Sequence, residues 1–194
     1  TLNEIKNINK KIIILTSVNA ILQKTINSKF INDYFFTIKK NTNINYNEFI
    51  KKLTLLGFEK TSVVREVSEF AVRGSIIDLF LSDNKNPLRL DFFDNFLSNI
   101  YEFDKFTQKK IKQVTNEVTI SPTSELIINN DSLNKFRSSF RNLFTNYMHS
   151  YAYNSFSDFH FPKGGENFLP LFNDKLSNIF SYCKNYTIIL NNNF

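Results

Sequence analysis

The period of the apolar residues changes at Gly57, and this change constrains the fold more than any other feature of the chain. Before Gly57, residues 45–56 show helical spacing, and Gly57 is a typical helix stop. The inner side of this expected helix consists of Phe49, Ile50, Leu53 and Leu56. After Gly57 the period falls to two, in runs at about 60–66, 69–80, 87–93, 96–103 and 114–120. A helix followed by short strands and polar turns predicts a meander-rich α+β unit.

Apolar segments outside this unit predict further strands and helices. Residues 11–16 predict a buried strand that leads into a helix capped by Ser17, and residues 186–190 predict a second buried strand. Residues 33–39 predict a strand, and Ser132 is expected to cap a helix over about 133–148. The two outer strands need a sheet to join, and the chain starts without Met, so we expect a piece of a longer protein.

The composition excludes several classes of protein. With 42% hydrophobic residues and 22 Phe in 194 residues, the chain can fill a core and is not intrinsically disordered. No apolar run reaches the roughly 20 residues of a membrane helix, and no export signal is visible. We therefore expect no membrane partner, and because the single Cys183 cannot form an internal disulfide, we expect a cytoplasmic protein. The net charge of +6 is compatible with nucleic-acid binding, but the lysines form no basic stripe.

Residues that carry common chemistries are missing or badly spaced. The four glycines, at 57, 74, 164 and 165, fit neither phosphate-binding motif. His149, His160 and Cys183 lack the spacing of zinc ligands, and no serine has the glycine frame of a hydrolase nucleophile. We therefore predict no catalytic residue, no metal site and no cofactor in this segment.

Two residue groups have both a functional and a structural interpretation. Asp78, Asp91 and Asp94 resemble a two-metal carboxylate cluster. Strand alternation separates Asp91 from Asp94, however, so pairing with nearby arginines is favoured. The aromatic residues are either a stacking platform for single-stranded nucleic acid or core, and the helical spacing of the first three favours core. These residues are Phe144, Tyr147, Tyr151, Tyr153, Phe156, Phe159 and Phe161.

The strand-like runs place charged and aromatic side chains together. Arg89, Asp91 and Phe93 share one face of their strand, and Arg73 lies on the polar side of the preceding run, just before Gly74. Arginine and aromatic residues dominate protein-binding hot spots. We expect Arg73, Arg89 and Phe93 to project together into solvent as such a surface. The alternative, in which Arg89 pairs with Asp78 and a helix covers Phe93, is equally compatible with the periodicity.

Five short runs form a pattern, namely LLGFEK at 55–60, EFAVRGSIIDLF at 69–80, LRLDFFD at 88–94, FD at 103–104 and TQ at 107–108, and the second and third are specific in combination. Together they resemble the UvrB-homology region near the N-terminus of bacterial transcription-repair coupling factors (Mfd), and residues 16–24 and 166–172 are similar to the flanks of that region. UvrB shares the central motif, but its aromatic DNA-gripping hairpin and its ATP loop are not seen here. The chain departs from the family pattern at Ser75, where a second glycine is usual, and at Asp94-Asn95-Phe96, where an acidic stretch is usual.

The resemblance implies an α+β / α/β fold with three parts. Residues 32–121 would be a UvrB-like UvrA-binding domain, made of an antiparallel sheet plus a helix. Residues 1–31 would be the end of a degenerate helicase-like subdomain, and residues 122–194 the start of its second half.

The resemblance also implies a function. The segment would bind UvrA through Arg73, Arg89 and Phe93, without catalysis, and recruit nucleotide excision repair to stalled RNA polymerase. The complete protein would be an ATP-dependent translocase on double-stranded DNA that displaces the polymerase through motor domains outside this segment. Two alternatives belong to other classes, a UvrB-like module that binds nucleic acid directly and a hydrolytic enzyme that uses the aspartate cluster.

Overall fold

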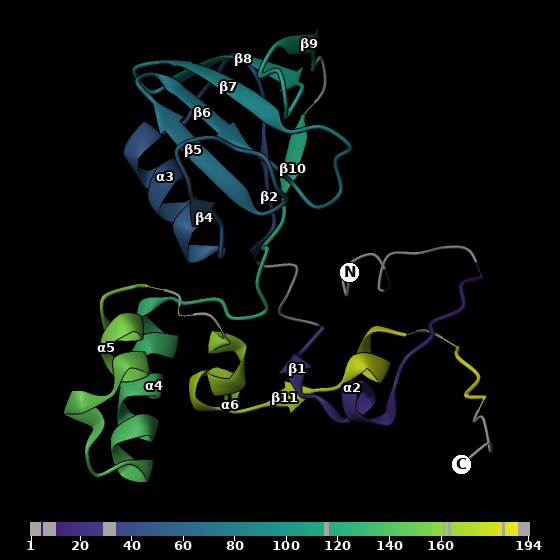
Figure 1. Cartoon of the computed structure of the whole chain (residues 1–194), viewed down its shortest axis with the longest axis vertical. Helices are drawn as coiled ribbons and strands as arrows, with labels where there is room; N and C mark the ends of the chain where they lie inside the picture. The colour runs from purple at the N-terminus through teal and green to yellow at the C-terminus, as the bar shows by residue number, and fades with distance from the viewer. Residues whose placement is uncertain are drawn as a thin grey trace.

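The computed structural model describes residues 5, 11–28, 34–114, 117–160, 162, 164–183 and 185–189. Within these residues a β-rich part is built from residues 34–120, and a mainly helical part is built from residues that follow it (Figure 1).

The β-rich part centres on a seven-stranded sheet in the order β3-β8-β7-β6-β5-β4, with β9 paired to another stretch of β8. Only β4 and β5 run parallel. Two further strands, β2 and β10, pair with each other in a separate ribbon. The strands are β2 Phe36–Ile38, β3 Thr42–Asn43, β4 Glu59–Lys60, β5 Glu69–Arg73, β6 Ile76–Leu79, β7 Leu88–Phe93, β8 Phe96–Phe103, β9 Lys110–Gln113 and β10 Val118–Ile120.

Helix α3, Tyr46–Leu55, covers one face of this sheet (Figure 1). The Asn45 side chain caps its first turn by accepting a hydrogen bond from the Glu48 amide, so residue 45 is the cap and not the first helical residue of the predicted range 45–56. Gly57 follows the helix with a φ of +89°, a left-handed conformation that favours glycine. The core between α3 and the sheet contains the inward side chains of both, including Phe49, Leu53, Leu90 and Phe92.

The helical part has its own core of aromatic side chains, which includes Phe136, Phe140 and Phe156. Helix α4 begins with a capping box in which Asn129 and Ser132 bond each other's backbone, so the cap is Asn129 and not Ser132 as predicted. The helix ends at Leu143, five residues before the predicted end. The elements are α4 Asn130–Leu143, η2 Tyr147–His149, α5 Tyr151–Ser157, η3 Gly165–Phe168, α6 Leu169–Phe172, β11 Leu176–Ser177 and η4 Ile179–Tyr182.

The N-terminal residues pack with the helical part, although the β-rich part separates the two in the sequence. Strand β1, Thr25–Ile26, pairs antiparallel with β11, and the Tyr182 hydroxyl donates to the Ile26 carbonyl over 2.7 Å. Helix α2, Val18–Leu22, precedes this pairing and is capped by Ser17, as expected. The exact boundaries at 31/32 and 121/122 stay predictions.

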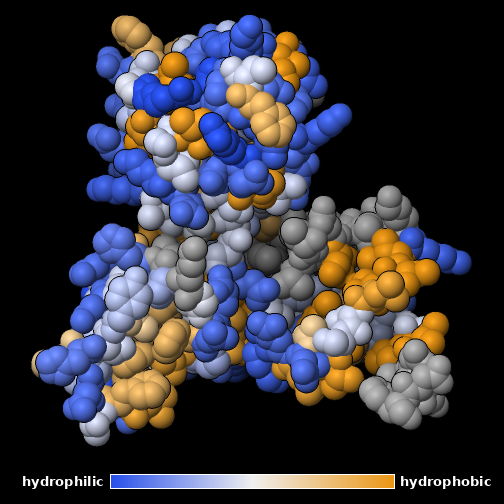
Figure 2. Space-filling model, viewed as in Figure 1, coloured by the Kyte–Doolittle hydropathy of each residue, from blue (hydrophilic) through white to orange (hydrophobic). Residues whose placement is uncertain are grey.

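The two predicted outer strands are corrected by the structure. Residues 11–16 and 186–189 form neither helix nor strand, and Ile13, Leu15 and Ile189 are largely exposed; residue 190 lies outside the described residues. A strand needs a neighbour to complete its backbone hydrogen bonds, and the described residues supply none alongside either run. Figure 2 shows apolar surface gathered over these N- and C-terminal segments.

Other strand predictions also change. The strand predicted at 60–66 is wrong, because β4 ends at Lys60 and residues 61–66 form no strand. The run at 69–80 divides into β5 and β6 around a turn at Gly74 and Ser75. Strand β9 was not predicted, because its four residues are all exposed and show no alternation of burial. No helix in the described part of the chain is long and apolar enough to cross a membrane.

Candidate functional site

The register of three antiparallel strands brings the predicted site residues onto one face of the sheet. Asp78 on β6 lies directly opposite Arg89 on β7, and Arg73 on β5 lies opposite Ile76, two residues from Asp78. Side chains two residues apart share a face, so Arg73, Asp78 and Arg89 meet on the side away from α3.

Asp78 and Arg89 form a buried ion pair with two parallel hydrogen bonds. Arg89 donates from Nε to Asp78 Oδ1 over 2.7 Å and from Nη2 to Oδ2 over 2.9 Å. Asp78 is 1% exposed and Arg89 is 9% exposed. The hydrogen bonds to Asp78 raise the pKa of Arg89, against the opposing effect of burial. Such a two-point contact holds both groups in one geometry.

A turn between β8 and β9 occupies the remaining side of Arg89. Arg89 Nη1 donates to the backbone carbonyl of Gln108 over 3.1 Å, and the Arg89 guanidinium group lies 4.5 Å from the centre of the Phe103 ring. Gln108 has a φ of +61°, and its side chain donates to the carbonyls of Val64 and Lys105. All three nitrogens of the Arg89 guanidinium group are therefore engaged inside the protein.

Arg73 has a different environment. Its Nη2 donates to Asp78 Oδ2, the oxygen that also accepts from Arg89, and its side chain is 44% exposed. This is the only side-chain hydrogen bond of Arg73 among the described residues, so Nε and Nη1 face no partner there. One buried carboxylate between two guanidinium groups leaves a net positive charge, and that charge reaches solvent at Arg73.

Phe93 lies at the end of β7 and is 75% exposed. It shares its face with Asp91 and Arg89, while Phe92 between them is buried against α3. Strand spacing puts the Cα atoms of Arg73 and Phe93 roughly 12 Å apart, which is within the span of one docking surface.

The sequence left open whether Arg73, Arg89 and Phe93 project into solvent together, and the structure shows that two of the three do. Arg73 and Phe93 are exposed on one face, as expected. The expectation that Arg89 also projects into solvent is wrong, because Asp78 and the turn at Gln108 enclose its guanidinium group. The alternative interpretation was right about the Asp78–Arg89 pair and wrong about a helix covering Phe93.

Two of the three aspartates form ion pairs. Asp78 holds the two arginines, Asp91 accepts from Lys110 Nζ over 2.8 Å, and Asp94 lies exposed in the turn between β7 and β8. The described residues contain no group of three or more His, Cys, Asp or Glu side chains that could hold a metal ion.

The aromatic residues between 144 and 161 divide between core and surface. Phe156 is fully buried, and Tyr147 and Tyr153 pack against the helical core. Phe144, Tyr151 and Phe159 are exposed, and Phe161 lies outside the described residues.

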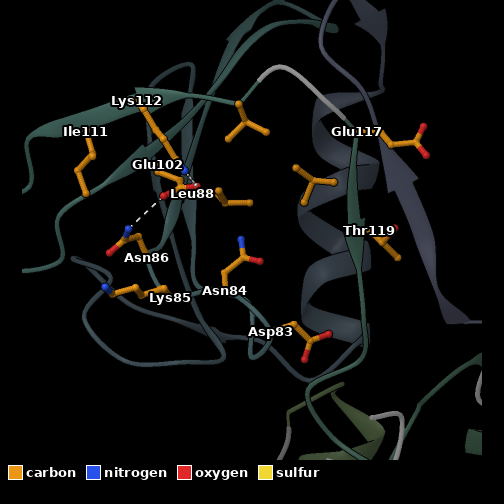
Figure 3. Close-up of a pocket in the computed structure, with 12 residues that line it drawn as sticks. Asp83, Asn84, Lys85, Asn86, Leu88, Glu102, Ile111, Lys112, Glu117 and Thr119 are labelled. Atoms are coloured by element: carbon orange, nitrogen blue, oxygen red, sulfur yellow. Dashed lines mark hydrogen bonds and ion pairs between the residues drawn. The ribbon is translucent and has the colours of Figure 1, made fainter. Parts of the chain in front are cut away.

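A cavity of about 720 Å³ opens at the other end of β7 and β8 (Figure 3). Glu102 in its wall accepts from Asn86 over 3.0 Å and pairs with Lys112 over 3.1 Å. Neither predicted arginine nor Phe93 lines this cavity. Its wall residue Leu88 alternates with Arg89 along β7, so the cavity and the arginines belong to opposite faces of the sheet.

Comparison with known proteins gives consistent findings. Residues 36–126 match the family described as UvrB interaction domain. The chain is also similar to proteins named transcription-repair-coupling factor. Identity is 30% over 181 residues in Rickettsia bellii, 32% over 190 residues in Rickettsia typhi and 27% over 181 residues in Escherichia coli. These alignments cover 92–97% of this chain but only 16–17% of each relative. The chain thus spans about a sixth of the length of these relatives.

Proposed function

We propose that this chain, which belongs to the transcription-repair-coupling factor family and carries a UvrB interaction domain at residues 36–126, is a segment through which such a protein binds UvrA. The observation that carries the proposal is that one sheet face presents both an exposed cationic group, Arg73, and an exposed ring, Phe93. Arginine and aromatic side chains are the residues that most often dominate binding energy at protein interfaces.

The three predicted contact residues take different roles in this proposal. Arg73 donates charge-assisted hydrogen bonds to a carboxylate of UvrA from its unoccupied Nε or Nη1, while its Nη2 stays on Asp78. Phe93 buries its ring in an apolar recess of the partner. Arg89 supports the surface from beneath, because it fixes the Asp78 carboxylate that orients Arg73.

Binding of purified UvrA to the chain and its variants tests the proposal. Arg73→Ala and Phe93→Ala are each expected to weaken the affinity by about 2 kcal/mol, or roughly 30-fold. Lys51→Ala, on the exposed side of α3, is the matched surface control and should bind like the wild type. The affinity of the wild type should also fall with added salt, and Arg73→Ala should show a smaller fall. Undiminished binding by the Arg73→Ala/Phe93→Ala double variant would contradict the proposal.

We also propose a role for a longer protein that contains this segment, based on its similarity to the transcription-repair-coupling factors. It would recruit nucleotide excision repair to stalled RNA polymerase, and displace the polymerase as an ATP-dependent translocase on double-stranded DNA, with catalysis outside this segment. Direct nucleic-acid binding by the segment has weaker support. The lysines around β9 are largely paired, Lys105 with Glu66 at 3.5 Å, Lys110 with Asp91 and Lys112 with Glu102. A gel shift with duplex and single-stranded DNA at physiological salt should therefore show no complex.

A further inference from the structure

A second phenylalanine is exposed beside Phe93 at the tip of the β7–β8 hairpin. Phe96 lies directly opposite Phe93 in the strand register, so both side chains stand on the same face. Phe96 is 38% exposed, whereas Phe92 and Leu97, the next opposed pair, are buried in the core. Neighbouring exposed apolar side chains of this kind are typical of interaction surfaces, whereas apolar side chains exposed singly are ordinary.

The backbone that carries the two rings is held in place. In the turn between them, Asn95 accepts hydrogen bonds from the Tyr46 amide over 2.9 Å and from the Ile44 amide over 2.7 Å. The Tyr46 hydroxyl donates to the Gly74 carbonyl, which ties the neighbouring β5–β6 turn to the same helix end. Rings presented from a fixed backbone lose little conformational freedom on binding, so more of their burial appears as affinity.

The two rings continue the surface that contains Arg73. Phe93 is two residues from Asp91, Asp91 lies opposite Ile76, and Ile76 lies opposite Arg73. Ile76 is partly exposed and lies beside Asp91, so a surface of apolar side chains and one ion-paired aspartate runs from the hairpin tip to the arginine. Its chemistry is two rings and a branched aliphatic side chain, with Arg73 at the border as an exposed cation whose Nε and Nη1 have no partner among the described residues, and with the Asp91–Lys110 ion pair alongside.

We propose that Phe96 is a second aromatic anchor of the UvrA-binding surface, and that the matching surface of UvrA is an apolar recess with a carboxylate on its rim. This inference rests on the proposed function and adds to it the residue and the chemistry of the partner. The recess receives Phe93 and Phe96 together, and the carboxylate meets Arg73.

The test compares two substitutions of Phe96 with a matched control. Phe96→Thr removes the ring and keeps a residue that favours strands, and it should weaken binding to purified UvrA about 10-fold. Phe96→Glu adds a negative charge to the surface that faces the rim carboxylate, so it should bind more weakly than Phe96→Thr at low salt, where repulsion acts over longer distances, and the difference should narrow at high salt. Phe106→Ser is the control, because Phe106 is equally apolar and largely exposed but lies beyond the other end of β8. It should bind UvrA like the wild type.

The outcomes separate this inference from the proposed function. The far-UV circular dichroism spectrum and the melting temperature establish that each variant is folded. If Phe93→Ala weakens binding while the folded Phe96→Thr and Phe96→Glu variants bind like the wild type, the anchor at Phe96 is refuted and UvrA binding stands. If Phe96→Glu equals Phe96→Thr at every salt concentration, the rim carboxylate is refuted. If the wild-type chain does not bind UvrA at all, both proposals are refuted.

Discussion

Removal of the Asp78 carboxylate should destabilise the β-rich part far more than removal of the exposed arginine that it contacts. Asp78 is 1% exposed, and the side chain of Arg89 is 11% exposed, so Asp78→Asn leaves a buried guanidinium group without its counter-charge. Breaking a buried ion pair from one side typically costs about 3–5 kcal/mol of the free energy of unfolding. Arg73 is 44% exposed on its side chain, so solvent screens its bond to Asp78, and Arg73→Ala should cost about 1 kcal/mol or less.

Urea unfolding followed by far-UV circular dichroism measures these differences. Because the β-rich part and the helical part have separate cores, amide hydrogen exchange in β5–β8 is needed to assign the loss to the sheet. A double-mutant cycle should give a large coupling energy for Asp78 with Arg89 and a small one for Asp78 with Arg73. The Asp78→Leu/Arg89→Met double variant, which replaces the pair with apolar groups, should recover much of the stability that Asp78→Asn loses.

Two results would refute this reasoning. One is an Asp78→Asn variant whose free energy of unfolding lies within about 1 kcal/mol of the wild type. The other is an Arg73→Ala variant that loses as much stability as Arg89→Ala, since the argument depends on their different burial.

The remaining predictions concern a turn and a titrating group. Gly57→Ala should lower the free energy of unfolding by more than about 1 kcal/mol, because φ is +89° and a Cβ there would lie 2.7 Å from the Ser124 Cβ. Thermal melting measures the loss. Gly74→Ala is the control that isolates the clash, because Gly74 also has a positive φ but has open space for a Cβ. The backbone hydrogen bond from Thr107, with a further bond from Phe106, lowers the pKa of Asp104 below its ordinary 3.8. Asp104 therefore stabilises the fold above its unfolded-state pKa, and this contribution is lost as pH falls through the lower folded-state pKa. The stability difference between wild type and Asp104→Asn should accordingly shrink as pH is lowered from about 5 to below 3, and a difference that grows would contradict the assignment.

Much of the β-rich part could be predicted from local pattern. The period of 3.6 before Gly57 and of two after it correctly predicted α3, β7 and β8, because each element needs one face apolar to pack on a core. The same logic failed for residues 11–16 and 186–189, since a β-branched run indicates a strand only if another strand lies beside it. It also missed β9, whose exposed side chains carry no signal of burial.

The sequence by itself determined that Arg89 and Phe93 share one face of their strand, because alternation along a strand is a local property of the backbone; that Arg73 lies on the same face follows from the cross-strand register. Only the tertiary structure decided which of these side chains solvent can reach. The cross-strand register set Asp78 opposite Arg89, and the turn at Gln108, 19 residues further along the chain, closed over the guanidinium group. Exposure depends on neighbours that are distant in sequence, so of two arginines in similar local patterns one is buried and the other is exposed.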